Sequence, residues 1–309
     1  MTVFVSVLLV FSISVSLSCA QDRLSRTKTA VSKDGAQPSK LVYDYSAPVT
    51  RYKMPHRLHE ISALTVLDST HLGAIQDEKG ILYVLDLTTG AVVSKKIFGK
   101  DGDYEGLEVA GDRLFVLRSD GVLFEIADWR AEELKTRKRK TGLSARNDNE
   151  GLAYDPVQNR LLIACKEYPG KGLKFHRAIY AYDLEQYRLS NTPVFSIDER
   201  SVRSHLRASD DLGERIRDAL LPVADLSDFK PSGLAIHPLT REMYLVSSVL
   251  KVVVVLSPEG VLTAVHRLAK KLFPQPEGIT FLPNGDLFIS NEGHGEKGTV
   301  LQFSPLARD

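Results

Sequence analysis

The chain has 309 residues, of which 43% are apolar and 26% are charged, so it can bury a full core and is not disordered as a whole. Forty basic and thirty-nine acidic residues leave a formal charge of +1, which excludes a bulk electrostatic attraction to nucleic acid. Partners must therefore be argued from local sites.

Residues 1–20, MTVFVSVLLVFSISVSLSCA, carry no charged side chain and end with the small residues Ser18 and Ala20, which predicts an export signal cleaved after the segment. The run is short for a bilayer span, which takes about 20 apolar residues, but an uncleaved anchor stays open. Cys19 leaves lipidation open as well, although Ser16 stands where a lipoprotein signal normally has Leu. We expect a protein of the periplasm or cell envelope.

Residues 21–40 are polar with no sustained apolar period, which predicts a flexible linker before a domain at 41–309. Without the leader, Cys165 is the only thiol, so an intramolecular disulfide is excluded. It lies in the apolar run RLLIAC, and we interpret it as a buried hydrophobic residue rather than a catalytic thiol.

A short pattern recurs five times, as HEISALTVL, YEGLEVA, NEGLAYDP, PSGLAIHP and PEGITFLP, and we take as its marker residues Glu60, Glu105, Glu150, Ser232 and Glu277. The intervals between markers are 45, 45, 82 and 45 residues. The long interval contains helix formers and no second marker, in SVRSHLRASDDLGERIRDALLPV. We therefore expect a partly helical insertion at about residues 197–223, with a sixth repeat as the alternative.

Each repeat contains short strands separated by turn residues. In the first they are ISALTVL, LGAIQ, ILYVLDL and AVVSKKIF, with turns DST, DEKG and TTG. Four strands recurring every 40 to 50 residues or so are typical of a β-propeller blade. The last repeat has three strands, and the fourth is expected from residues 40–53, which closes the ring without an open edge. The predicted fold is an all-β, five-bladed propeller of four-stranded antiparallel blades.

The markers precede the innermost strands, so they are expected to meet at one mouth of the axial channel. Each second strand runs back to the same mouth. This return adds polar residues as candidate ligand or phosphate contacts, namely Asp77, Arg118, Asp120, Lys166, Ser248, Asn291 and Glu292. Ser232 joins them from the marker set.

Four carboxylates aimed at one axis, from Glu60, Glu105, Glu150 and Glu277, repel one another and raise their own pKa values unless a cation neutralises them. With Asn291 they form an oxygen donor set, which favours Ca²⁺ as the cofactor. The Gly that follows most markers permits close backbone approach. The alternative is that Glu and Gly only form the turn before each strand and that the acids are solvated.

Six segments resemble the SdiA-regulated family of exported bacterial proteins over residues 55–305: IQDEKGILYVLD, GDYEGLE, NEGLAYDPVQNRLLIACKE, PSGLAIHP, QPEGITFLPNGDLFISNEG and GTVLQF. The resemblance implies a five-bladed propeller with a bound calcium ion, distantly akin to proteins with NHL repeats and related by fold to calcium-dependent phytases. It implies no defined reaction.

Three other motifs are weaker. DGDYEGLEVAGD, from Asp101 to Asp112, imitates an EF-hand loop, but its flanks read as strands. His56 and His59 in HRLHE match no zinc motif, and we expect surface side chains on opposite faces at the start of a strand. The basic run KTRKRK, residues 135–140, fits a solvated outer strand or loop, and without aromatic interleaving it does not predict nucleic-acid binding.

Two functions compete. The first is a calcium-binding scaffold or ligand-binding module, acting as a monomer on an unidentified ligand or envelope protein. The second is a calcium-dependent phosphoester hydrolase in which Arg118 and Lys166 hold phosphate oxygens while the metal activates water. The plain alternative for both basic residues is ion pairing with Asp120, Glu167 or the acidic ring. Whether the chain is an enzyme stays open.

Overall fold

The computed structural model describes residues 42–209 and 229–306. These residues belong to one compact unit that spans residues 38–309. The predicted leader at 1–20, the linker at 21–40 and Cys19 lie outside the described residues, so their predictions stay predictions.

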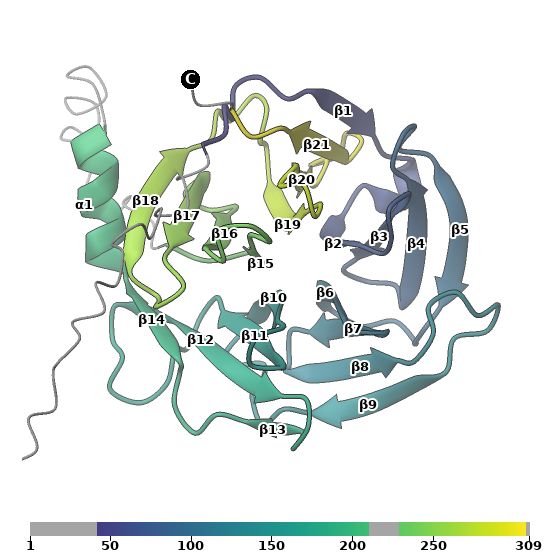
Figure 1. Cartoon of the computed structure of the whole chain (residues 1–309), viewed down its shortest axis with the longest axis horizontal. Helices are drawn as coiled ribbons and strands as arrows, with labels where there is room; N and C mark the ends of the chain where they lie inside the picture. Colours follow the sequence, from purple (N-terminus) through teal and green to yellow (C-terminus); the bar gives the residue numbers. More distant parts are fainter. Residues whose placement is uncertain (1–41, 210–228, 307–309) are drawn as a thin grey trace, which may run out of the picture. The chain divides into compact units, whose positions relative to one another are not determined.

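The described chain forms five antiparallel sheets arranged around a central axis (Figure 1). Blade 1 consists of β2 (Ile61–Val66), β3 (His71–Gln76), β4 (Ile81–Asp86) and β5 (Val92–Ile97). Blade 2 consists of β6 (Tyr104–Ala110), β7 (Arg113–Arg118), β8 (Val122–Ile126) and β9 (Thr136–Lys140). Blade 3 contains β10 (Asn149–Asp155), β11 (Arg160–Cys165), β12 (His176–Asp183), β13 (Arg188–Leu189) and β14 (Phe195–Asp198). Blade 4 consists of β15 (Gly233–Ile236), β16 (Met243–Ser247), β17 (Val252–Leu256) and β18 (Leu262–Arg267).

Blade 5 joins the two ends of the domain. Its inner strands are β19 (Pro276–Phe281), β20 (Leu287–Asn291) and β21 (Thr299–Phe303), and its fourth strand is β1 (Thr50–Lys53). Strand β1 pairs antiparallel with β21 from Thr50 opposite Gln302 to Lys53 opposite Thr299. The predicted five-bladed propeller and its closure by a strand within residues 40–53 are both confirmed.

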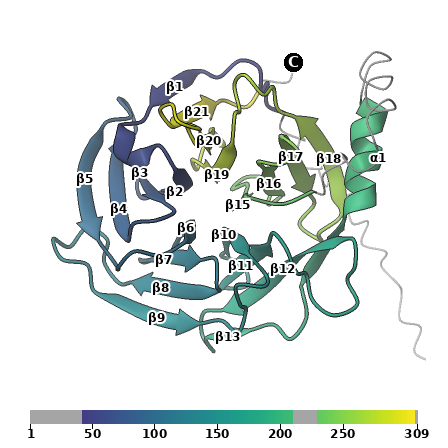
Figure 2. The same cartoon turned by 180° about the vertical axis from the view of Figure 1, so that it is seen from behind.

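The predicted insertion is partly helical, as expected. Helix α1 (Glu199–Ser209) follows β14 and lies along β18 of blade 4, as both views show (Figure 2). Its buried side chains Val202 and Leu206 share a hydrophobic cluster with Val252 of β17. The remainder of the predicted insertion, residues 210–223, lies outside the described residues.

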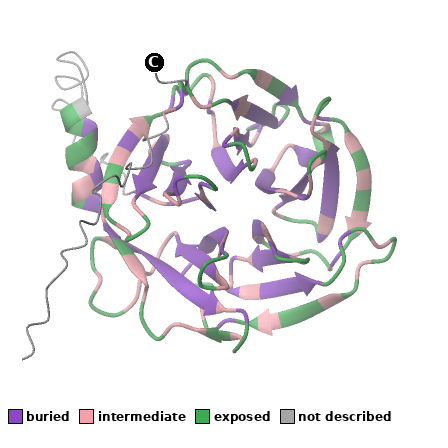
Figure 3. Ribbon diagram, viewed as in Figure 1, coloured by how far each residue is buried: buried purple, intermediate pink, exposed green. Residues whose placement is uncertain are grey.

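The core lies between neighbouring blades. Burial follows the inner and middle strands, whereas exposed residues alternate along β5 and β9 (Figure 3). One cluster joins blades 1 and 2 through Ile75, Leu107 and Phe124, and another joins blades 4 and 5 through Val253 and Leu301. Among the described residues, no helix is long and apolar enough to span a bilayer.

Four smaller expectations have clear outcomes. The EF-hand imitation falls on strand β6, and KTRKRK supplies strand β9, both as the sequence predicted. Cys165 is fully buried, and burial raises the pKa of its thiol to about 12. His56 and His59 lie at the surface as expected, but the expectation that they point to opposite faces was wrong. His56 opens a 3₁₀ turn, η1 (His56–Leu58), in which residues three apart eclipse, so the two rings stack with centroids 4.9 Å apart.

Candidate functional site

Irregular pairing at the start of the innermost strands builds the mouth of the axial channel. In blade 2 the register shifts between Tyr104 and Gly106, which leaves Glu105 outside the regular ladder. The same shift isolates Glu150 in blade 3. A β-bulge re-aims the extra side chain, so these local irregularities direct the carboxylates toward the axis.

Three sets of equivalent positions surround this mouth. The bulge tier holds the residues at the register shift and their equivalent in blade 4: Ser62, Glu105, Glu150, Ser232 and Glu277. The rim tier lies two residues earlier in each blade and holds Glu60, Asp103, Asp148, Lys230 and Gln275. The return tier follows the second strands and holds Asp77, Ser119, Lys166, Ser248 and Glu292.

The marker predicted for blade 1, Glu60, lies two residues before the structural equivalent of the other markers. The register shift of β2 falls between Ile61 and Ala63, so Ser62, and not Glu60, is the equivalent of Glu105. Glu60 belongs to the rim tier, where its charge contributes to the raised pKa of Asp77. Alignment on the apolar residues that follow the marker, rather than on the acid, would have identified Ser62 from the sequence.

Serine replaces glutamate in the bulge tier where the hydroxyl joins two blades. Ser62 donates to the carbonyl oxygen of Tyr104 at 2.7 Å, from blade 1 to blade 2. Ser232 donates to the carbonyl oxygen of Pro276 at 2.8 Å, from blade 4 to blade 5. Both acceptors immediately precede a bulge-tier glutamate, so the two serines hold the backbone that presents Glu105 and Glu277.

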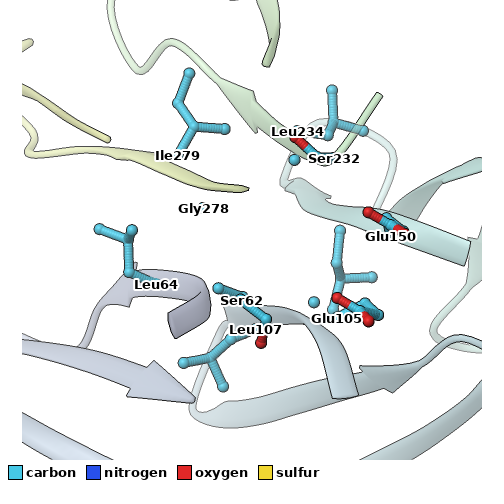
Figure 4. Close-up of a pocket in the computed structure, with 13 residues that line it drawn as sticks. Ser62, Leu64, Glu105, Leu107, Glu150, Ser232, Leu234, Gly278 and Ile279 are labelled. Atoms are coloured by element: carbon cyan, nitrogen blue, oxygen red, sulfur yellow. The ribbon is translucent and has the colours of Figure 1, made fainter. Parts of the chain in front are cut away.

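The glycine after the bulge residue is required by close packing, as expected. A Cβ on Gly151 would lie 2.8 Å from the Cβ of Leu234 in the next blade, and one on Gly278 would lie 2.6 Å from Leu64 Cδ2. A narrow axial cavity with a volume of about 10 Å³ is lined by four bulge-tier residues, Ser62, Glu105, Glu150 and Ser232, together with Leu64 and Leu234 (Figure 4). That volume is about the room needed by a single water-sized species.

Lys166 and Glu150 form an ion pair in the mouth, with Nζ 2.5 Å from Oε1. Burial alone lowers the pKa of the Lys166 ammonium, but the carboxylates of Glu150 and Glu277 more than reverse this and raise it. Burial raises the pKa of Glu150 to about 8, although Lys166 opposes that shift. Lys166 therefore neutralises part of the negative charge of the mouth.

The other acids of the mouth also have raised pKa values, because nearby positive charge does not offset their burial and mutual repulsion. Burial, followed by the charge of Glu150, raises the pKa of Glu105 well above its ordinary value. Burial raises the pKa of Glu277 to about 7, while Lys166 and hydroxyl hydrogen bonds oppose the increase. Glu292 reaches about 8 because of burial and the charge of Glu277. These shifts have the direction that the sequence predicted for carboxylates around a shared axis.

Arg118 and Asp120 bind each other instead of facing the ring. The Arg118 guanidinium donates Nε and Nη2 to the two carboxylate oxygens of Asp120, at 2.9 and 2.7 Å. The same guanidinium lies 5.6 Å from the centroid of the Phe124 ring, inside blade 2. The plain interpretation of Arg118 as an ion-pair partner of Asp120 therefore describes the structure, and Lys166 likewise pairs with the ring.

The remaining predicted residues divide between the mouth and its wall. Asp77, Ser248 and Glu292 belong to the return tier, and the hydroxyls of Ser232 and Ser248 lower the pKa of Glu277 by hydrogen bonding. Asn291 is fully buried at the end of β20, and its amide nitrogen lies 3.4 Å from Thr299 Oγ1. Its Oδ1 atom has no hydrogen-bond partner among the described residues.

The rim tier contains two acids that sequence reasoning missed. Asp103 accepts a hydrogen bond from Ser119 Oγ at 2.5 Å, and its charge contributes to the raised pKa of Glu105. Asp148 has a raised pKa because of burial, which Lys166 opposes. The signal was present as D-x-E-G at both sites, since each acid stands two residues before a marker.

The donor set of the mouth fits a hard cation by its chemistry. Across the three tiers, eight carboxyl groups face two ammonium groups, those of Lys166 and Lys230. Oxygen donors without Cys or His suit Ca²⁺. The described residues contain no group of three or more His, Cys, Asp or Glu side chains already gathered to hold a metal ion.

The sequence model of the SdiA-regulated family matches residues 38–294, and the chain belongs to this family. The match covers all five blades up to β20, which agrees with the resemblance found in the repeats. No curated protein sequence matches the chain.

Solved structures resemble the chain at low sequence identity. The glutaminyl cyclase of Myxococcus xanthus is 14% identical, with a TM-score of 0.55, over 85% of this chain and 97% of that one. A streptogramin B lyase is 9% identical, with a TM-score of 0.44, over 82% of this chain and 97% of that one. At this identity the match to the glutaminyl cyclase shows the fold alone.

Proposed function

We propose that this SdiA-regulated propeller is a calcium-dependent binding module whose acidic mouth holds the ion and presents it to a ligand or an envelope partner. The observation that carries the proposal is the excess of carboxylates in the three tiers, with raised pKa values at Glu105, Glu150, Glu277 and Glu292. A divalent cation lowers the free energy of such a cluster by neutralising it.

Two further features support the proposal. The orphaned Oδ1 atom of Asn291 is a buried acceptor of the kind that a cation or its bound water satisfies. The hydroxyls of Ser62 and Ser232 hold the backbone on which the acids stand, so the ring keeps its position when its charges change. The residues that would hold the ion are Glu105, Glu150 and Glu277, with Asn291 and Glu60 as the remaining predicted ligands.

The geometry favours this module over the phosphoester hydrolase. That alternative needs Arg118 and Lys166 to hold phosphate oxygens. Arg118 is bound through two nitrogens to Asp120, and Lys166 is bound to Glu150. The mouth is also rich in carboxylates, which repel a phosphate dianion unless several cations are present.

Calorimetric titration with Ca²⁺ tests the proposal. We expect one class of site in the purified protein, and at least about tenfold weaker binding in Glu105→Gln and Glu150→Gln, which corresponds to about 1.4 kcal/mol. Glu132→Gln is the matched control, because it makes the same chemical change at an exposed position in blade 2. Unchanged affinity in both ring variants removes these residues from the ligand set.

The hydrolase has its own readout. Phosphomonoesters are incubated with the protein with and without EDTA, and the module proposal expects no metal-dependent turnover. Turnover that EDTA abolishes and that Lys166→Met lowers would favour the hydrolase over the module.

Export to the periplasm or cell envelope is part of the proposal and rests on residues 1–20. Mass spectrometry of the mature protein distinguishes the three outcomes. Cleavage after residue 20 gives a soluble product, an intact leader gives an anchored one, and a lipid adduct on Cys19 gives a lipoprotein.

Sedimentation of the purified protein tests the expected monomer.

A further inference from the structure

Blade 3 differs from the other blades in its outermost strand. In the other four blades a single strand occupies this position, whereas β12 is covered by two short strands. Strand β13 pairs with Tyr182 and Asp183 at one end, and β14 pairs from His176 to Ile179 at the other. Both lie beside β12 in Figure 1.

The interruption between β13 and β14, called the break below, is stabilised by specific hydrogen bonds to β12. The carbonyl oxygen of Ala181 accepts the backbone N–H of Ser190 at 2.7 Å, and the N–H of Ala181 donates to Ser190 Oγ at 3.1 Å. Farther along, the N–H of Val194 donates to the carbonyl oxygen of Ile179 at 2.8 Å. These backbone groups of β12 therefore have hydrogen-bond partners. The chain between Ser190 and Val194 can turn outward without leaving them unpaired.

A cavity of about 300 Å³ lies at this break, which is at the lower end of the volumes of small-molecule sites. Its apolar lining comes from Ala181, Leu189 and Val194. Its polar lining comes from the β10–β11 turn, the adjoining ends of β11 and β12, and the chain from the β12–β13 turn into the break: Gln158, Arg160, Asp183, Gln186, Arg188, Ser190 and Asn191.

Most of the polar lining is free to bind a ligand. The side chains of Gln158, Gln186, Arg188 and Asn191 make no hydrogen bond to another described residue. Arg160 is positioned by Nε, which donates to Asp155 Oδ2 at 3.0 Å, so its guanidinium has a fixed orientation in the lining. The cavity thus combines two guanidinium groups and three carboxamides with the carboxylate of Asp183, which lies opposite both arginines in the strand register.

These groups define the chemistry of the ligand. A guanidinium recognises a carboxylate through two parallel hydrogen bonds. Carboxamides both donate and accept, which matches the hydroxyl groups of a sugar, and an apolar wall of small side chains can contact the C–H face of a sugar ring. We propose that the cavity at the break in blade 3 binds a small carboxylated saccharide, with Arg160 and Arg188 on the carboxylate.

The experiment measures binding of glucuronic and galacturonic acid to the purified full chain by calorimetry, with glucose and galactose as matched neutral sugars. We expect the two acids to bind and the neutral sugars to bind at least about tenfold more weakly. Arg188→Gln is expected to weaken binding of the acids about tenfold, and because Arg188 is exposed, this change leaves the fold intact.

Two controls separate this site from the axial mouth. Glu105→Gln changes the mouth and is expected to leave saccharide binding unchanged, whereas Arg188→Gln is expected to leave Ca²⁺ binding unchanged. Equal binding of acidic and neutral sugars, full binding by Arg188→Gln, or no binding of either acid at about 20 mM would each overturn the proposal. None of these results depends on whether the mouth binds calcium.

Discussion

His237 should make this propeller sensitive to acid, and the structure allows the size of the effect to be worked out. The side chain is fully buried beyond strand β15 of blade 4. Its Nδ1 accepts the backbone N–H groups of Leu239 and Thr240, both at 3.1 Å, so the proton of the neutral ring lies on Nε2. Nε2 donates to Tyr43 Oη at 2.8 Å, and Tyr43 donates to the carbonyl oxygen of Gly285 at 2.6 Å.

This chain of hydrogen bonds joins the segment before β1 to blades 4 and 5, and it requires a neutral imidazole. Burial lowers the pKa of His237 from its ordinary 6.5 to about 4. Between these two values the unfolded chain binds more protons than the folded one, so this contribution to stability is present above pH 6.5 and is lost as the pH falls. The loss is about 2 kcal/mol by pH 5 and about 3 kcal/mol when complete.

Urea unfolding followed by fluorescence of the single tryptophan, Trp129, measures the effect at pH 7 and pH 5. The acids of the mouth have raised pKa values, so their titration increases the free energy of unfolding as the pH falls. The comparison therefore needs a variant that lacks the imidazole of His237. His237→Asn retains an acceptor for the turn and does not titrate. We expect the parent protein to lose about 2 kcal/mol more than this variant between the two pH values. A difference below about 0.5 kcal/mol would refute the reasoning.

Three other substitutions test the packing and charge of the blades. Glu105→Gln should stabilise the calcium-free protein by about 1 kcal/mol, seen as a higher Tm, because the amide avoids the cost of burying a titrating carboxyl group and removes repulsion at the mouth; a lower Tm would contradict this. Glu125→Gln should cost about 2–4 kcal/mol in urea unfolding, because Glu125 accepts from Arg113 and Arg139, each at 2.8 Å, within blade 2; a loss below about 0.5 kcal/mol would count against it. Gly278→Ala should cost about 1–3 kcal/mol, because its Cβ has no room beside blade 1; an unchanged midpoint would show that the two blades can separate at no cost.

The sequence failed at particular points of the mouth for a physical reason. A β-bulge adds one residue to one strand, and nothing in the local composition of HEISALTVL states where that residue lies. The sequence comparison therefore assigned Glu60, instead of Ser62, to the bulge position of blade 1. For Arg118 the sequence left phosphate contact and pairing with Asp120 both open, because the carboxylate within reach depends on the folded chain.

By itself, the sequence determined the number of blades, the closing strand and the gathering of acids at one end of the axis. These properties follow from hydrophobic alternation, turn residues and repeat length, all of which act over a few neighbouring residues. Only the tertiary structure decided the pairing of Lys166 with Glu150 and the cavity at the break in blade 3. The same holds for the hydrogen bonds by which Ser62 and Ser232 join neighbouring blades. Those features join residues from separate strands, and their energies depend on distance and burial, which exist only after the blades have packed.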